Sequence, residues 1–459
     1  MASPTAIHLF TYRVGFGDCF LLRFEYGAKA RHVLVDFGST APASKAIGNQ
    51  MLDVAKDVAE RCEGRLDAIV ATHRHRDHVS AFAGSTWKVI ERLRPRLAVL
   101  PWTEHPDAET DATVAPSGTK GRIGARSSAH VRSLSDMQAV AAAALKELRR
   151  RGGAPPSPTD DDADPFAEAF DDEPDSPWAR DDLGPPPIGT PFGKGLAREI
   201  AFVGEDNLGN AEAMKNLLSL PALDFVCFGS KTRLEKLLPG VRVRVLGPPT
   251  LAQTEAIRGQ RSRDPDEFWH VMALAGTRAA RAGAAALFPG VKAVNPRGLP
   301  FETRWFLKRL DGVRAGELLE IVRVLDEAMN NTSVILLFEA LGKKMLFPGD
   351  AQIENWSYAL ADAPTRELLA GVDVYKVGHH GSLNATPRTL WGLFAKRGGP
   401  RSARLKTFVS TRAGKHGSPS RGTEVPRKKL VEALEAESDL FSTQQLRAKK
   451  DFVQAQQIA

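Results

Sequence analysis

Four potential metal ligands fall within six residues of one another near the start of the chain. His73 and His75 are followed by Asp77 and His78, directly after the apolar run at residues 66–71. In an extended backbone, side chains two positions apart point to the same side, so the first two imidazoles face together. Imidazole and carboxylate groups suit Zn²⁺ and similar divalent cations. The alternative is a solvated His-rich loop, but three of only eleven histidines gathered behind one strand favour a metal site.

Three more potential ligands also follow apolar strands. Asp350 comes after residues 345–347 and a Pro-Gly turn, and His379 and His380 come after residues 372–377. Layered α/β enzymes gather their catalytic groups where strands end. Taken alone, Asp350 would be an ordinary turn aspartate, and the histidine pair would be a weak signal. Their shared setting predicts that they join the first cluster in one site.

The pattern of apolar residues alternates between strand and helix periods, which predicts an α/β fold with layered α+β character. Strands are predicted at residues 7–13, 19–25, 32–36, 66–72, 97–102, 225–229, 241–246, 332–339, 344–347, 372–377 and 406–410. Helices are predicted at residues 133–151, 231–238, 353–360 and 426–435. Pro and Asp dominate residues 152–192, which predicts a linker or mobile loop.

The charge of the chain is unevenly distributed. The formal net charge is +7, yet residues 160–182 hold eleven acidic residues and one arginine, so the remainder carries +17. An excess of positive charge favours anionic partners such as phosphodiesters or nucleic acid. The alternative is a basic surface that serves solubility alone. The acidic, Pro-rich segment is a candidate docking site for a protein partner or a self-inhibitory segment, against the simpler interpretation of a solvated linker.

The cysteines and the N-terminus bear on the compartment. Cys19, Cys62 and Cys227 lack paired spacing, which argues against disulfides and cysteine zinc knuckles. We find neither a signal-peptide pattern nor a run of about 18 apolar residues. The sequence therefore predicts a cytoplasmic protein without a membrane span.

The ordered motifs resemble those of the metallo-β-lactamase superfamily. HxHxDH at residues 73–78, Gly349-Asp350, and His379-His380-Gly381-Ser382 carry the resemblance. The ComEC/Rec2-like branch, with its hydrolase domain, is similar in further motifs, at residues 14–20, 34–38, 330–333 and 415–419. The matching segments, residues 7–103, 223–249 and 330–425, cover about half the chain. The resemblance implies a four-layer αββα sandwich.

This fold implies a division of the chain into five parts. Residues 1–105, 223–249 and 329–459 would form the metallo-β-lactamase domain, and the last of these parts would include a C-terminal helix. Residues 106–222 and 250–328 would be insertions, the second of them helical.

The resemblance also implies the site. His73 and His75 would bind one zinc ion, Asp77 and His78 a second, and Asp350 would bridge them; Mn²⁺ or another divalent ion is an alternative. One of His379 and His380 would complete the second site, and its neighbour would face the substrate as a phosphate contact or proton donor. The implied reaction is hydrolysis by a metal-activated hydroxide, which Asp77 would orient.

Some assignments stay open. Many superfamily members supply a further histidine to the first metal, and in that interval this chain has His105, His130 and His270. Asp18 and Asp36 are interpreted mainly as turn carboxylates that bond backbone amides, with support of a metal-bound histidine as the alternative.

A last motif contains Lys415, His416 and Ser418. It is either a phosphate-binding rim for substrate or a solvated basic loop.

The function that the sequence predicts is metal-dependent hydrolysis of phosphodiesters, with a nuclease as one form of it. A first alternative is hydrolysis of an ester, thioester or lactone, because the same hydroxide attacks carbonyl groups. A second is a degenerate metal-binding scaffold that serves as a subunit of a larger complex.

Overall fold

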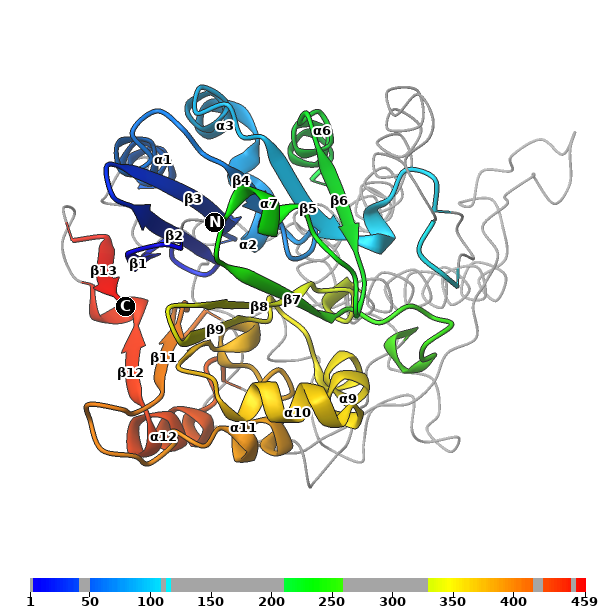
Figure 1. Cartoon of the computed structure of the whole chain (residues 1–459), viewed down its shortest axis with the longest axis vertical. Helices are drawn as coiled ribbons and strands as arrows, with labels where there is room; N and C mark the ends of the chain where they lie inside the picture. The colour runs from blue at the N-terminus through cyan, green and yellow to red at the C-terminus, as the bar shows by residue number, and fades with distance from the viewer. Residues whose placement is uncertain are drawn as a thin grey trace, which may run out of the picture.

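Two mixed β-sheets carry the fold (Figure 1). The computed structural model describes residues 3–40, 50–108, 113–116, 210–258, 329–415, 424–446 and 451–459. The first sheet has seven strands in the order β13 (Val453–Gln457), β1 (Ala6–Tyr12), β2 (Cys19–Tyr26), β3 (Lys29–Phe37), β4 (Ala68–Val70), β5 (Leu97–Pro101) and β6 (Leu223–Val226). The second has six, in the order β12 (Asp439–Ser442), β11 (Lys406–Val409), β10 (Val374–Lys376), β9 (Lys343–Phe347), β8 (Ile335–Ala340) and β7 (Arg242–Gly247).

Each sheet begins as an antiparallel meander and continues with parallel strands. Strands β1, β2 and β3 pair antiparallel, and β3 to β6 pair parallel. Strands β7, β8 and β9 repeat the meander, and β9 to β12 are parallel. Parallel neighbours need a crossover between them and place their carboxyl ends at one edge. The loops that follow β3 and β4 therefore lie together in the first sheet, and those that follow β9 and β10 in the second; contacts between side chains join the two pairs.

The two sheets pack face to face over a shared apolar core. Along β2, Phe20 and Phe24 face this inner core, and Phe338 and Phe347 reach it from the second sheet. The rings of Phe20 and Phe347 lie 5.9 Å apart in an edge-on contact. The intervening residues of β2, such as Leu21, point to the opposite face of the first sheet. Strands β4, β5 and β8 are covered on both faces, which explains why they are nearly continuous runs of apolar residues, whereas β7 alternates and exposes Arg242 and Arg244.

Helices cover the outer face of each sheet (Figure 1). The core outside the first sheet receives residues from α1 (Gln50–Arg61), α3 (Gly84–Glu91) and α6 (Ala211–Leu218). The core outside the second sheet receives residues from α9 (Ile353–Ala361), α10 (Ala363–Ala370), α11 (Arg388–Leu393) and α12 (Lys428–Glu437). Helix α6 lies within the range predicted as the first insertion, yet its buried face belongs to the first sheet's core. Its Met214 and Leu217 are fully buried.

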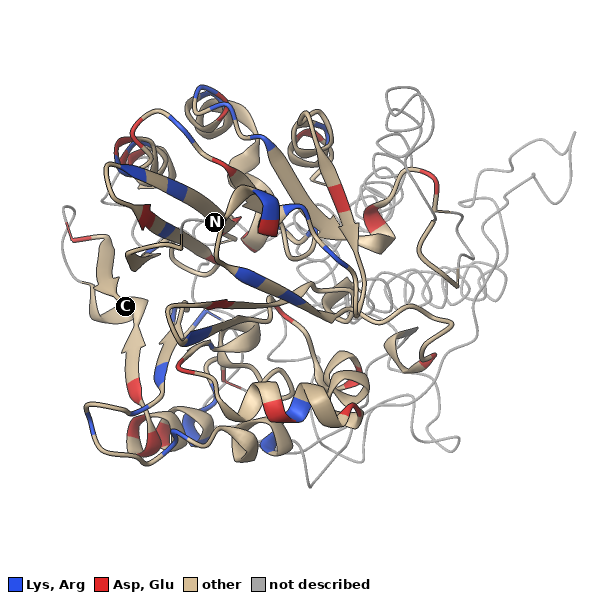
Figure 2. Ribbon diagram, in the orientation of Figure 1, with Lys and Arg blue, Asp and Glu red and all other residues tan. Residues whose placement is uncertain are grey.

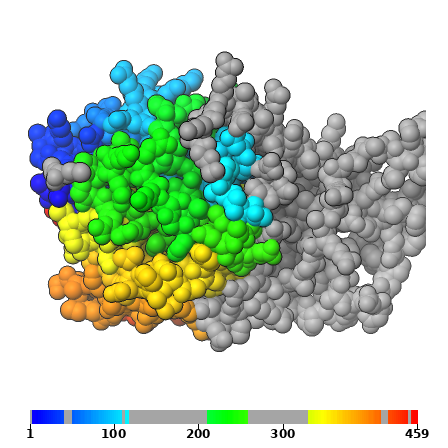
Figure 3. Space-filling view, turned by 45° about the vertical axis from the view of Figure 1, so that its right-hand side comes forward, coloured from blue at the N-terminus to red at the C-terminus, as the bar shows by residue number. Residues whose placement is uncertain are grey.

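The segment 210–258 connects the two halves of the molecule. It gives β6 to the first sheet, forms the short helix α7 (Leu234–Leu237), and gives β7 to the second sheet. Figure 3 shows this segment, in green, across the middle of one face, between the N-terminal and the C-terminal parts. Each sheet therefore contains residues from distant parts of the sequence.

The predicted α/β class is confirmed, and the predicted strands match observed ones within a few residues. Strands β12 and β13 were not predicted. Each residue of β12 is only half-buried, and β13 reads Val-Gln-Ala-Gln-Gln, so neither shows the apolar runs of the other strands. The helix predicted at residues 133–151, the acidic segment and most of the insertion at 250–328 lie outside the described residues. Within the described ranges, no helix is both long and apolar enough to span a bilayer.

The turn between β8 and β9 allows a test of backbone strain. Ala340 pairs with Lys343, so Leu341 and Gly342 form a two-residue turn with φ of 51° and 69°. Such turns prefer Asn-Gly, because a left-handed residue other than glycine or asparagine is strained by about 1–2 kcal/mol. Leu341 is also 41% exposed. We expect Leu341→Asn to raise the free energy of unfolding by up to about 1 kcal/mol in urea denaturation. Leu341→Ala is the control and should not raise the free energy of unfolding. An equal increase in both variants would mean that exposure of the leucine side chain, and not the φ angle, destabilises the wild type.

Candidate metal centre

The predicted ligands meet at the edge where strands of both sheets end. The loop after β4 carries His73 and His75 and leads into the short helix α2 (Arg76–Val79), which holds Asp77 and His78. The loop after β9 carries Asp350. The loop after β10 turns sharply at Gly378–Gly381, which contains both later histidines. Residues 272 and 303 positions apart in the sequence therefore lie in contact.

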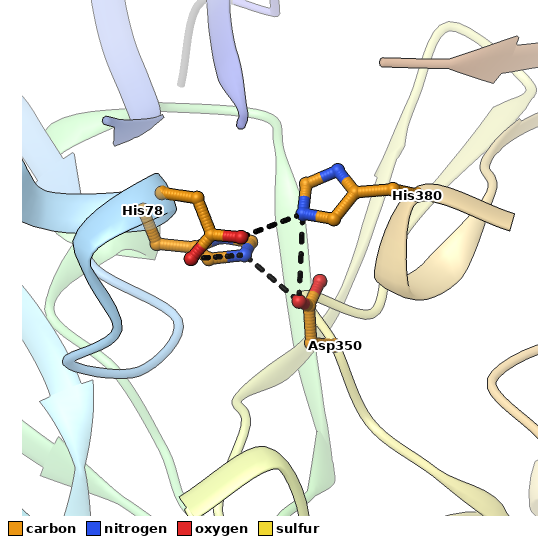
Figure 4. Close-up of side chains that lie close together, drawn as sticks. His78, Asp350 and His380 are labelled. Atoms are coloured by element: carbon orange, nitrogen blue, oxygen red, sulfur yellow. Dashed lines mark hydrogen bonds and ion pairs between the residues drawn. The ribbon is translucent and has the colours of Figure 1, made fainter. Parts of the chain in front are cut away.

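Asp77, His78, Asp350 and His380 form the centre of the cluster. All four are buried, and one ligand atom from each lies within 4.8 Å of the others. His78 Nε2 is 2.9 Å from Asp350 Oδ2. His380 Nε2 is 3.0 Å from Asp77 Oδ2 and 3.7 Å from the same oxygen of Asp350 (Figure 4). Two carboxylates and two imidazoles that point at one place are a suitable donor set for a divalent cation.

His73 and His75 lie beside this centre. Their rings are 4.6 Å apart, which agrees with side chains two positions apart on an extended chain. The ring of His73 is 4.2 Å from that of His78, and its Nε2 is 4.0 Å from Asp350 Oδ2. Asp350 thus faces both parts of the HxHxDH motif, as a bridging residue must.

Buried polar atoms at the site lack hydrogen-bond partners. His73 Nε2 and Asp77 Oδ1 are both of this kind. A buried polar group without a partner costs free energy, and most such groups in proteins are satisfied. Both atoms are of the types that bind divalent cations. The donor set therefore fits a bound metal, which would satisfy atoms that the described chain does not.

His380 and His379 differ in burial and in the atoms that their rings face. The imidazole of His380 is fully buried and its Nδ1 donates a hydrogen bond to the carbonyl of Ser410 at 2.8 Å, which leaves Nε2 facing Asp77. The side chain of His379 is 27% exposed, and its Nε2 is 3.9 Å from Asp350 Oδ2. The two residues have φ of 41° and 53°, so consecutive left-handed residues turn neighbouring rings to different surroundings. His380 is the ligand candidate, and His379 borders the site at the surface.

Asp36 orients His78 from the side opposite Asp350. Its carboxylate accepts hydrogen bonds from the backbone amide and the hydroxyl of Thr72, both at 2.8 Å, and lies 2.9 Å from His78 Nδ1. A carboxylate behind a ligating imidazole fixes the ring and its tautomer. Asp36 therefore bonds a backbone amide, as the sequence predicted, and also supports the histidine, which was the alternative.

Lys376 is a residue of the site that the sequence analysis missed. It is 2% exposed, and its ammonium contacts Asp18 Oδ2, lies 3.5 Å from Asp350 Oδ1 and donates to the carbonyl of Gly349 at 3.0 Å. Burial would lower its pKa, but Asp18 and Asp350 outweigh burial and raise it. The available signal was a lysine near the end of the strand predicted at residues 372–377, in which Asp373 is the only other charged residue, because a buried strand has no place for an unpaired charge.

Charge interactions across the site hold the acids ionised. Burial would raise the pKa values of Asp77 and Asp350, but the surrounding imidazoles, His78 first among them, lower both pKa values. Burial and the neighbouring rings of His78 and His75 hold the pKa of His73 well below its usual value. Loss of hydration beside the cluster likewise lowers the pKa of His379 to about 4, although its side chain is partly exposed. Burial would lower the pKa values of His78 and His380, but Asp350 and the neighbouring carboxylates outweigh burial and raise both. A metal ion would have to displace these protons, because deprotonated carboxylates and neutral imidazoles are the forms that bind metal.

Other predicted site residues are less well connected. His105 is buried just after β5, with its Nδ1 accepting the amide of Asp107 at 3.0 Å and its ring against Phe225. It belongs to neither of the two groups of close ligand atoms among the described residues. Lys415 lies half-buried in the loop after β11. His130, His270, His416 and Ser418 lie outside the described residues, so the phosphate-binding rim and the third ligand of the first metal stay predictions.

Comparisons with known proteins do not identify a family for this chain. No protein-family model matches the chain, and no curated protein matches it.

Gly349 offers a test of how the backbone places Asp350. It has a φ of 57°, and an added Cβ would lie 2.6 Å from Cβ of Thr72, closer than such atoms come in proteins. Gly349→Ala should therefore lower the free energy of unfolding by at least about 2 kcal/mol, from φ strain and overpacking together. Denaturant titration of the metal-depleted protein measures this loss.

Gly342→Ala is the matched control for this variant. Gly342 has a similar φ of 69°, but an added Cβ would meet nothing within 4 Å. It should lose only the strain component, about 1–2 kcal/mol. Equal losses in the two variants would show that contact with Thr72 does not constrain Gly349.

Proposed function

We propose that this chain is a metal-dependent hydrolase with the four-layer αββα sandwich of the metallo-β-lactamase superfamily, acting on phosphodiesters. The buried cluster of Asp77, His78, Asp350 and His380, with His73 directed at the same Asp350 oxygen, carries the proposal. The order of the motifs in the sequence supports it independently. Two sheets with helices on their outer faces, and ligands at one edge between them, agree with this fold.

The ligands divide into two adjacent groups. His73 and His75 would hold one Zn²⁺ ion, and Asp77, His78 and His380 would hold a second, with Asp350 between them. Mn²⁺ is the alternative, because nitrogen and oxygen donors also suit that ion. Bound cations of this kind supply Lewis acidity and lower the pKa of water.

The protein's own residues prepare the site for this chemistry. Asp36 fixes the ring of His78 so that Nε2 faces the cluster. The backbone carbonyl of Ser410 does the same for His380 by accepting a hydrogen bond from its Nδ1–H. Asp77 is held ionised and has one oxygen without a hydrogen bond, so it can orient a nucleophilic water. His379, partly exposed beside Asp350, can contact the substrate.

The choice of a phosphodiester rests on the sequence more than on the visible surface. The chain outside the acidic segment carries +17, which favours an anionic substrate. Figure 2 shows basic and acidic residues interspersed along the described elements, as on α10 and α12. Esters, thioesters and lactones are attacked by the same nucleophile, and a substrate comparison must decide between the classes.

Metal content measured with activity tests the proposal. We expect the purified protein to bind two equivalents of zinc and to hydrolyse bis(nitrophenyl) phosphate and DNA faster than a panel of lactones and thioesters. Asp350→Asn should lose zinc and reduce turnover to the buffer rate, because it removes the carboxylate that would hold both cations. His8→Asn is the control, since His8 lies on β1 with a 26% exposed side chain, and it should keep both properties.

The possible outcomes separate the functional classes. Faster turnover of lactones or thioesters would replace the phosphodiester assignment and keep the hydrolase. Zinc binding without turnover of any of these substrates would support the scaffold. Unchanged phosphodiester turnover in Asp350→Asn would refute the proposed site.

The histidine pair gives a second, independent test. We expect His380→Asn to lose about half of the bound zinc, because its buried Nε2 faces the second group of ligands. His379→Asn should keep both zinc ions and lose mainly kcat, because its ring is at the surface of the site. Zinc is measured by elemental analysis after gel filtration. The reverse pattern, with zinc lost from His379→Asn alone, would exchange the two assignments.

A further inference from the structure

The site contains a second group of close ligand atoms, behind the first. Asp18, Asp36 and His78 each offer one, and all three residues are buried. These atoms are already used within the chain. Asp36 Oδ2 accepts from the Thr72 hydroxyl and faces His78 Nδ1, and Asp18 Oδ2 contacts the ammonium of Lys376. The second group therefore positions the ligands of the first group, and the ammonium of Lys376 supplies the positive charge that a metal ion would otherwise supply there.

Lys376 touches three groups that come from two loops. Asp18 lies between β1 and β2, and Gly349 and Asp350 follow β9. Its ammonium donates to the Gly349 carbonyl at 3.0 Å and lies 3.5 Å from Asp350 Oδ1. The other carboxylate oxygen, Oδ2, is the one that faces His73, His78 and His380. Lys376 thus engages Asp350 from the side away from the histidines.

We propose that Lys376 is a positioning residue that keeps Asp350 Oδ2 turned toward the histidines, by holding Oδ1 and the preceding carbonyl and by balancing Asp18. This deepens the proposed function and rests on it, because the orientation matters only if Asp350 binds metal. A carboxylate ligand that is held from behind binds more tightly than one that is free to rotate, and loss of such a partner typically weakens metal binding about 10–100-fold.

The same lysine stabilises the fold of the loops. Asp18 is fully buried, and in the described chain neither of its oxygens accepts a hydrogen bond besides this ion pair. The Nδ1 atoms of His380 and His78 lie 3.6 and 3.7 Å from it, farther than the ammonium. Removing one partner of a buried pair leaves an uncompensated charge, which is strongly destabilising. A stability loss alone would therefore not distinguish positioning from simple charge balance. The test must separate zinc affinity from folding.

Lys376→Met is the central variant, and zinc affinity is measured by competition with a chromophoric chelator on protein that is folded by circular dichroism. We expect its zinc dissociation constant to rise about 10–100-fold. Lys376→Arg keeps the charge and should lie closer to the wild type. Lys406→Met is the matched control: Lys406 opposes Val374 on the neighbouring parallel strand, and its loss should leave zinc affinity unchanged.

The double variant Asp18→Asn/Lys376→Met keeps the test decisive if Lys376→Met folds poorly. Removing both charges should restore much of the thermal stability, because Asp18 no longer needs a partner. Zinc affinity should stay low, because Asp350 still lacks its contact. Wild-type affinity in either folded variant overturns the positioning role while the hydrolase stands. Absence of zinc from the wild type itself would instead overturn the proposed function, and this inference with it.

Discussion

Four buried carboxylates at one edge of the two sheets are the constraint on which the arrangement of the loops depends. Each of Asp18, Asp36, Asp77 and Asp350 is at most 7% exposed. A buried carboxylate without a partner is expensive, so each must meet a cation or a donor. The partners come from other segments. Asp36 accepts a hydrogen bond from Thr72 and pairs with His78, Asp18 pairs with Lys376, and Asp77 pairs with His380. Charge compensation therefore joins loops from both sheets.

Close backbone packing makes this convergence possible. The amide of Asp18 donates to the carbonyl of Asp77 at 2.9 Å, which connects the β1–β2 loop to helix α2. At Gly38, an added Cβ would lie 2.3 Å from the carbonyl oxygen of Arg76, so only glycine permits the approach. The glycine of the Gly-Asp motif at 349–350 is required for the same steric reason, because Gly349 packs directly against Thr72. The glycines in the motifs thus act through steric fit, and the acids beside them act through charge.

Local strain at the site has a chemical consequence. His379 and His380 occupy the left-handed region consecutively, and Asp36 does so as well, with a φ of 53°. Such conformations cost free energy and persist where surrounding contacts enforce them, which is most often at functional sites. Here they direct His380 inward to Asp77 and leave His379 at the surface. One turn of four residues therefore provides both a candidate ligand and a candidate substrate contact.

The sequence by itself determined the class of the fold, most strands and the members of the cluster, because these depend on short patterns. Apolar runs predict strands, and polar residues at their ends predict where side chains gather. His73, His75, Asp77, His78, Asp350 and the later histidine pair could be named from such patterns alone. The edge strands β12 and β13 were not predicted, because they are polar or half-buried and lack an apolar run.

Only the tertiary structure decided which atoms face one another. The choice between His379 and His380 depends on two φ angles and on the carbonyl of Ser410, and neither is encoded in the neighbouring residue types. The double role of Asp36 and the presence of Lys376 depend on pairing between strands and loops far apart in the chain. Burial made these pairings necessary, since water no longer screens the charges, and burial is a property of the folded layers and not of any single motif.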